Sequence, residues 1–143
     1  MIERVEGAAL RVYAAHRRRS LEGVARDAAR VQETALLHLV RRLPAAPSIV
    51  SYAVKLARAT RPDAPEASPE VKKYVSWGAG PRASQYLILG AKARAAMDGR
   101  AMPDLDDVVA MALPVLAHRV VLNFQADAEG VTAAKVVAGL PKP

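Results

Sequence analysis

Gly78-Ala79-Gly80-Pro81-Arg82-Ala83-Ser84 is the stretch of sequence around which the chain is organised. Glycines at 78 and 80 allow a sharp turn with a close backbone approach, and proline suits the first helical position, where no N–H is needed. The stretch therefore predicts a helix from Pro81. Its first turn would present unpaired N–H groups and a positive dipole end, with the Arg82 guanidinium beside them. These features favour a phosphate-facing corner, but a plain turn with a solvated arginine has the same spacing.

The composition predicts an all-α protein of one domain, or one domain with an extension. The chain has 143 residues, of which 52% are hydrophobic but only 4% aromatic, and much of the apolar content is alanine. That mixture favours helix over strand. Without cysteine there is no disulfide framework and no thiolate chemistry, and no apolar run approaches the roughly 20 residues of a membrane span. We expect a soluble, cytoplasmic protein, whose net charge of +7 fits a nucleic acid, an acidic partner or solubility alone.

The first half of the chain predicts three helices. Residues 1–19 show a moderate helical pattern, and Ser20 is placed to cap a second helix that ends at Pro44 and Pro47. The second helix has an apolar stripe that needs a partner surface. Its members are Leu21, Val24, Ala28, Val31, Ala35 and Leu39. A third helix is expected from Ser48 to near Thr60, with Ile49, Tyr52, Ala53 and Leu56 on its inner side.

From Arg61 to Gly80, prolines at 62, 65 and 69 suggest a loop of about twenty residues, and long loops in compact domains are usually either functional or disordered. Trp77, the only tryptophan, is expected to anchor the turn at Gly78 with its large apolar ring. This loop would deliver the chain to the helix at Pro81.

The second half predicts further helices with clear caps. The helix from Pro81 should end at Asp98-Gly99, with Gly99 in the left-handed conformation. Asp104 is a predicted N-cap, and Asp106 and Asp107 fall in the following first turn, which explains the three carboxylates better than a metal site does. The stripe of that helix is Val108, Met111, Ala112, Val115 and Leu116; Pro114 should bend it and His118-Arg119 should close it. Val121-Leu122-Asn123-Phe124 should be extended or irregular, and Thr132 should cap a short helix through Ala138.

The sequence lacks the motifs of a self-sufficient active site. Gly78, Gly80 and Ala83 satisfy the pattern G-x-G-x-x-A, but the flanking strands that a dinucleotide site requires are not evident. No phosphate-loop sequence G-x-x-x-x-G-K-[ST] occurs, and no G-x-S-x-G elbow. The three histidines, His16, His38 and His118, do not have the spacing of zinc ligands. We therefore predict no catalytic residue and no metal site.

Several motifs together resemble the C-terminal lid of MoxR-type AAA+ ATPases. The segments that carry the resemblance are Arg41-Arg42-Leu43-Pro44, the helix at 48–56, Ala59-Thr60-Arg61-Pro62, Gly78 to Ala95, Gly99-Arg100, Asp107-Val108 and Pro114 to Arg119. They occur in the family's order and span about residues 30–140. Residues 1–29 do not resemble the family. The expected organisation is an N-terminal helical extension over 1–29 and an AAA+ lid over 30–143.

The resemblance implies a small helical bundle that lies over a nucleotide bound by a preceding α/β domain. It places the sensor-2 arginine, directed at the γ-phosphate, on Arg82, with Gly78, Gly80 and Pro81 as the supporting turn. ATP and magnesium would be bound only through that core domain, so we do not expect this chain to hydrolyse ATP alone. The family resembles chaperones that form hexameric rings and act on partner proteins, often ones with a von Willebrand factor A domain. His118 and Arg119 also match a family motif, and we expect them to be structural.

Two alternatives from other classes stay open at this point. The positive charge and helical content are compatible with a DNA-binding module whose Arg82 helix enters a groove. That helix, however, offers mainly alanine, leucine and isoleucine where polar side chains are needed, which argues against nucleic acid. The other alternative is an oligomerisation module built on the apolar stripe of residues 21–39.

Overall fold

The computed structural model of the chain describes residues 38 and 40–142, and residues 40–142 belong to one compact unit. The predicted helix over 1–19, His16 and the apolar stripe of residues 21–39 lie outside the described residues, as does the extension over 1–29. The predicted second helix, from the Ser20 cap to Pro44 and Pro47, is described only near its end, where residues 40–42 are helical. The helices and strands described in full begin with α2 (Pro47–Ala59), and seven further elements follow it. In order, the elements are α2 (Pro47–Ala59), α3 (Pro69–Tyr74), β1 (Val75–Trp77), α4 (Pro81–Met97), α5 (Leu105–Leu116), β2 (Val121–Leu122), α6 (Phe124–Ala128) and α7 (Ala133–Ala138).

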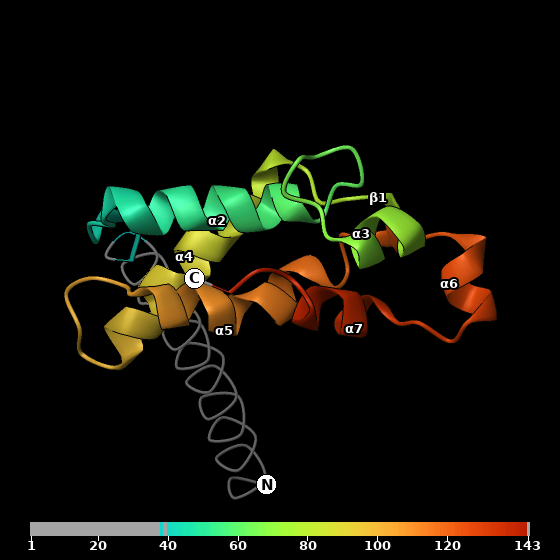
Figure 1. The fold of residues 1–143 in the computed structure, drawn as a ribbon. Helices are drawn as coiled ribbons and strands as arrows, with labels where there is room; N and C mark the ends of the chain where they lie inside the picture. The colour runs from blue at the N-terminus through green and yellow to red at the C-terminus, as the bar shows by residue number, and fades with distance from the viewer. Residues whose placement is uncertain (1–37, 39, 143) are drawn as a thin grey trace, which may run out of the picture. The chain divides into compact units, whose positions relative to one another are not determined.

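Three helices, α2, α4 and α5, form the centre of the bundle. α4 packs against both α2 and α5, and Figure 1 shows α2 on one side of the unit with α5 and α7 on the other. The inner positions predicted for α2 are correct, since Ile49, Ala53 and Leu56 are buried and Tyr52 is half-buried. The predicted all-α class is confirmed: the unit is mostly helical, with one short two-stranded ribbon.

Small residues allow the central helices to approach closely. The inner face of α4 includes Ala83, Ala91 and Ala95, all with no exposed surface, around the fully buried Leu87. A Cβ on Gly90 would lie 2.8 Å from the Met111 sulfur of α5, so only glycine fits there without displacing that side chain. The alanine-rich composition therefore produces a tightly packed bundle with few large core side chains.

The predicted loop over 61–80 is wrong in its second half, where the chain forms α3 and β1. Ser68 caps α3 by accepting a hydrogen bond from the Val71 N–H at 3.2 Å, and the Val71 side chain is fully buried. Pro69 occupies the start of this helix. Proline is tolerated there because the first N–H of a helix has no partner within the helix. The proline that suggests a break thus marks a helix start.

The short ribbon joins two segments that the sequence does not predict as strands. β1 and β2 are antiparallel, with Val75 opposite Leu122 and Trp77 opposite Val121. Trp77 is 74% exposed, so the prediction that its large apolar ring anchors the Gly78 turn is wrong. The segment predicted over 121–124 as extended or irregular is extended at Val121–Leu122, which form β2. Asn123 then caps α6 by accepting a hydrogen bond from the Ala126 N–H, so Phe124 is helical, which the sequence does not predict.

The ends of the remaining helices follow the predicted caps closely. Gly99 has φ of 70°, as a left-handed residue after α4 should. Thr132 caps α7, which ends at Ala138. α5 includes Pro114 and ends at Leu116, two residues before the predicted closing pair. Among the helices of residues 40–142, none combines the length and the apolar character that crossing a membrane requires.

Candidate functional site

The turn before α4 is hydrogen-bonded to the residues that follow α2 through one residue, Ala79. The Ala79 N–H donates to the Thr60 hydroxyl oxygen at 2.8 Å, and the Ala79 carbonyl accepts a hydrogen bond from Arg61 Nε at 3.0 Å. The Thr60 hydroxyl in turn donates to the Ala57 carbonyl of α2 at 2.7 Å. Thr60 and Ala79 are both completely buried. Both backbone polar groups of Ala79 are therefore held by the residues that follow α2.

The two glycines of the turn differ in how much space surrounds them. A Cβ on Gly78 would lie 2.5 Å from the Thr60 carbonyl oxygen and 2.6 Å from Arg61 Cα, so the backbones are already in contact. Nothing lies within 4 Å of a Cβ on Gly80, and its φ is −78°. The close approach expected of the turn thus requires only Gly78. Gly80 is the N-cap of α4, and Pro81 takes the first helical position.

Arg82 lies in the first turn of α4 and its side chain is exposed. That turn has no acidic residue, and within residues 40–142 Arg82 forms no ion pair with a carboxylate. A cation at a helix N-terminus faces the positive end of the helix dipole and lowers helix stability. The position is therefore one where an arginine has no local stabilising partner but is available to an anion.

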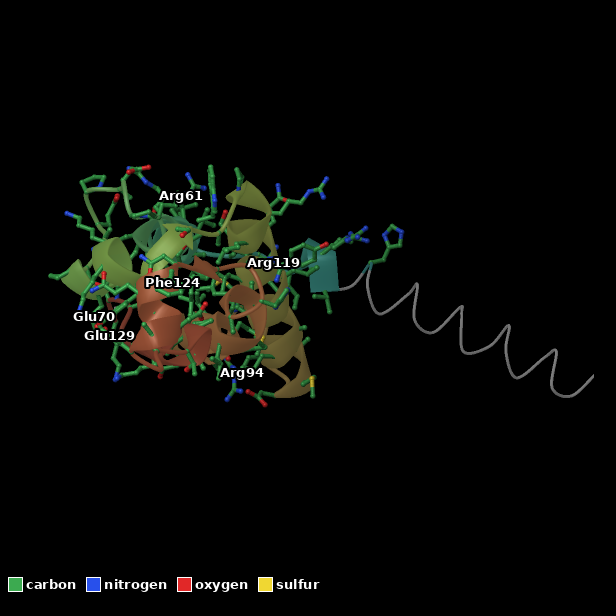
Figure 2. The ribbon with its side chains drawn as sticks, turned by 90° about the vertical axis from the view of Figure 1, so that its right-hand side faces the viewer. Arg61, Glu70, Arg94, Arg119, Phe124 and Glu129 are labelled. Carbon is green, nitrogen blue, oxygen red and sulfur yellow. The ribbon has the colours of Figure 1, made fainter. Side chains whose placement is uncertain are left out.

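Arginines at the other end of α4 are fully engaged by carboxylates. Arg100 binds Asp107 through two hydrogen bonds of 2.7 Å and also pairs with Asp98 and Asp104, while Arg94 Nε lies 3.1 Å from an Asp107 oxygen. The paired guanidinium lowers the pKa of Asp107 to about 2 against the opposing effect of its burial. The pKa of Arg100 is raised by the same contacts. Figure 2 shows Arg94 far along the bundle from Arg61, which lies at the turn.

The predicted N-cap at Asp104 is confirmed, and it is part of a complete capping box. Asp104 accepts a hydrogen bond from the Asp107 N–H at 3.0 Å, and the Asp107 carboxylate accepts one from the Asp104 N–H at 2.9 Å. Asp107 is only 1% exposed, although the sequence predicts it merely as a favourable charge in the first turn. The signal that could have found its partner is Arg100, which directly follows the left-handed Gly99.

Arg119 has contacts that suit a structural residue. Its guanidinium donates to the Val115 carbonyl near the end of α5 at 2.5 Å, contacts His118, and lies 5.0 Å from the centre of the Tyr86 ring. A cation there compensates the negative end of the α5 dipole. Within the part of the chain that the structure describes, no group of three or more acidic or histidine side chains is arranged to hold a metal ion.

A family model described as the AAA lid domain matches residues 67–140, which include α3, the Gly78 turn, Arg82 and the Arg100–Asp107 network. The chain is 34% identical over 106 residues to Chaperone MoxR1 of Mycobacterium tuberculosis, a match that covers 74% of this chain and 27% of that protein.

Similarity extends to a solved structure, the crystal structure of a candidate ATPase from Cytophaga hutchinsonii. It has a TM-score of 0.67 and 29% sequence identity, over 71% of this chain and 31% of that one. The chain thus spans about a quarter to a third of the length of these relatives. The family match covers just over half of the chain, and the helical architecture is that of the family. The chain therefore belongs to the AAA lid domain family and is homologous to the MoxR1 chaperone.

Proposed function

We propose that this chain is the lid of a MoxR-type ATPase and that Arg82 is its sensor-2 residue. In this proposal, Arg82 contacts the γ-phosphate of ATP, and the ATP with its magnesium ion is held by a core domain that carries the phosphate loop. The lid contributes one charged contact and the rigid bundle behind it. It contributes no ligand to the metal.

The contrast among the arginines at the two ends of α4 supports this proposal most directly. Arg94 and Arg100 both form ion pairs with Asp107, whereas Arg82 is exposed and unpaired within residues 40–142, at a helix end where its charge is unfavourable. Residues that break a local stability rule are commonly found at functional sites. An anion in front of α4 would remove the unfavourable interaction, because it would be attracted both by the helix N-terminus and by the guanidinium.

The chemistry of a guanidinium suits the discrimination of ATP from ADP. It is planar, always charged and able to donate two parallel hydrogen bonds to a phosphate. Loss of the γ-phosphate removes the group that Arg82 would contact, so the lid would be held in one orientation by ATP and released after hydrolysis. The Gly78 turn supports this role, since the fastened Ala79 fixes where α4 begins.

The wider context of the proposal follows the chain's relatives. The similarity to Chaperone MoxR1 supports a chaperone-like machine. We extend the proposal to a homo-oligomeric ring, a hexamer as the resemblance to MoxR-type ATPases implies, and to partner proteins that contain a von Willebrand factor A domain. These partners and the cytoplasmic location stay predictions.

The test is a fusion protein in which the full 143-residue chain replaces the matched segment of the Cytophaga candidate ATPase, whose remaining chain would supply the phosphate-loop core. We expect Arg82→Ala to lower ATP turnover at least tenfold, because a charge-assisted contact to phosphate is lost. Arg82→Lys should recover only part of the activity, since it keeps the charge but not the two-pronged donor. Lys55→Ala, which removes an exposed cation of α2, is the matched control and should leave turnover unchanged.

Two results would contradict the proposal. One is a fusion in which the wild-type lid gives no more ATP binding or turnover than the core without it. The other is unchanged turnover in Arg82→Ala. The isolated chain should not hydrolyse ATP in either case. Submicromolar, salt-sensitive binding of duplex DNA by the chain would favour the alternative class, although α4 buries its face of Ala83, Leu87 and Ala91 inside the bundle.

A further inference from the structure

The contact between the end of α2 and the Gly78 turn involves more than packing. Thr60 is one of two polar residues that are fully buried within residues 40–142, the other being Asp107. Its hydroxyl both donates, to the Ala57 carbonyl, and accepts, from the Ala79 N–H. Because buried polar groups are costly unless they are paired, replacing this hydroxyl leaves the Ala79 N–H without a partner.

Arg61 completes the attachment from the other side of the same residue. Its Nε donates to the Ala79 carbonyl at 3.0 Å, and the side chain is half-buried. No carboxylate in residues 40–142 forms an ion pair with Arg61, so the hydrogen bond to Ala79 is what orients its side chain. The side chain of the neighbouring Arg58, in contrast, pairs with Glu66 at 3.3 Å.

Only a short and stiff stretch of backbone separates Ala79 from Arg82. Gly80 is the N-cap, its carbonyl accepts a hydrogen bond from the Ala83 N–H at 3.0 Å, and Pro81 has a ring-restricted φ. Behind this stretch, Gly78 is in backbone contact with Thr60 and Arg61, so the turn cannot move closer to α2. A displacement of the end of α2 is therefore transmitted to the first turn of α4.

We infer that Thr60 and Arg61 are positioning residues that set the orientation of Arg82 toward the nucleotide. The inference rests on the proposed function, because it assigns to these two side chains a role that is exercised through Arg82. It also assigns to α2 a role beyond the core: its C-terminal end and the sensor arginine move as one unit when the lid changes orientation.

The experiment is a double-mutant cycle in the same fusion protein, with the affinities for a non-hydrolysable ATP analogue and for ADP as readouts. Thr60→Val keeps the side-chain shape but removes the hydroxyl, and Arg61→Lys keeps the charge but removes Nε. We expect each to lower the ratio of ATP to ADP affinity by about threefold to tenfold, the loss typical of a single hydrogen bond. Thr60→Ser should retain the wild-type ratio, and so should Arg58→Ala, the matched control that leaves the turn untouched.

The decisive comparison repeats these variants in an Arg82→Ala background. If Thr60 and Arg61 act through Arg82, their substitution there should cause no further loss of discrimination. A full, additive loss in that background would overturn the inference, and so would lowered thermal stability with an unchanged affinity ratio, which indicates a purely structural role. Should Thr60→Val fail to fold, Arg61→Lys provides the same test at a half-buried site. An Arg82→Ala variant with wild-type discrimination would instead refute the proposed function itself, and the positioning role with it.

Discussion

The arginines at the two ends of α4 have opposite environments. At the C-terminal end, Arg94 and Arg100 converge on one buried carboxylate, Asp107, which is also part of the capping box of α5. At the N-terminal end, Arg82 is exposed and has no carboxylate partner within residues 40–142. The backbone that carries it is nevertheless held firmly, through Ala79.

The ion pairs of Arg94 and Arg100 stabilise the fold, whereas the charge of Arg82 is exposed to solvent and has no stabilising role. Asp107 joins α4, the following turn and α5 into one unit, so its loss should affect folding. Arg82 contributes nothing of this kind, and the helix dipole even opposes its charge. The same residue type thus has a structural role where it is neutralised and a proposed binding role where it is not.

The largest effect on stability is expected for Asp107→Ala. The substitution removes the partner of two guanidinium groups and half of the capping box, which should cost about 3 kcal/mol of unfolding free energy. For a domain of this size the midpoint of thermal unfolding should fall by more than about 10 °C in circular dichroism. Asp106→Ala, an exposed position in the same helical turn, is the control and should cost no more than about 0.5 kcal/mol. Equal effects of the two variants would refute the structural assignment.

A smaller but clear destabilisation is expected at the N-terminal end for Gly78→Ala. The added methyl group would meet the backbone of Thr60 and Arg61 at 2.5–2.6 Å, and relieving that overlap should cost about 2 kcal/mol. Gly80→Ala is the matched control because the space around it is open and its φ is negative, so the change should stay within about 0.5 kcal/mol. Urea denaturation of both variants measures the two unfolding free energies. Similar values would mean that the backbone contact at Gly78 does not constrain the turn.

Acid should weaken the C-terminal end of α4 selectively. The pKa of Asp107 is lowered from 3.8 to about 2, mainly by the hydrogen bonds from Arg100. A depressed pKa in the folded state means that this stabilisation is complete above about pH 4 and is lost as the pH falls toward 2. Asp107→Asn should therefore be less stable at pH 7 and should lose less stability between pH 4 and 2. Denaturation at several pH values measures this slope, and parallel slopes for both proteins would contradict the assignment.

Glu129 supplies an internal comparison for the acid experiment. Its pKa is lowered to about 2 by the Tyr74 hydroxyl first and then by Lys73 and Gln125, which link α3 to α6. Figure 2 labels Glu129 on the same side of the bundle as Glu70. Because these groups are exposed, they should contribute less to the acid slope than Asp107, and Glu129→Gln should leave most of the slope in place.

The smallest effect is expected for Arg82→Ala, and its sign is informative. Removing a cation from the first turn of α4 relieves an unfavourable interaction with the helix dipole, and alanine is a good helix former. The isolated chain should therefore keep its stability or gain up to about 0.5 kcal/mol in thermal or chemical denaturation. A loss of more than 1 kcal/mol would mean that Arg82 has a structural partner, and the contrast between the two ends of α4 would disappear.

The sequence predicts the helices well where local signals are self-contained. Pro81, Gly99, Asp104 and Thr132 mark helix ends through rules that involve only neighbouring residues, and each is found as expected. The segment from 61 to 80 was predicted less well because its structure depends on partners distant in sequence. Val71 is buried against other elements, and β1 exists only by pairing with β2, some 45 residues later.

The candidate site shows the same division. The turn and the exposed arginine are visible in the sequence, because glycine, proline and helix polarity act locally. The roles of Thr60, Arg61 and Asp107 are not visible, since each depends on which residue the fold brings opposite it. The family match supports the lid assignment, and the division into an extension over 1–29 and a lid over 30–143 stays a prediction.

The sequence by itself determined the helical class of the chain and the two ends of α4. It also determined that Arg82 occupies a first-turn position where no neighbouring acidic residue balances its charge. Those properties follow from backbone conformation and the 3.6-residue period, which operate within a few residues. Only the tertiary structure decided that Thr60 and Arg61 hold Ala79, that Trp77 faces outward, and that Asp107 neutralises the far end of α4. Hydrogen bonds and ion pairs between distant residues depend on distances that no local pattern encodes.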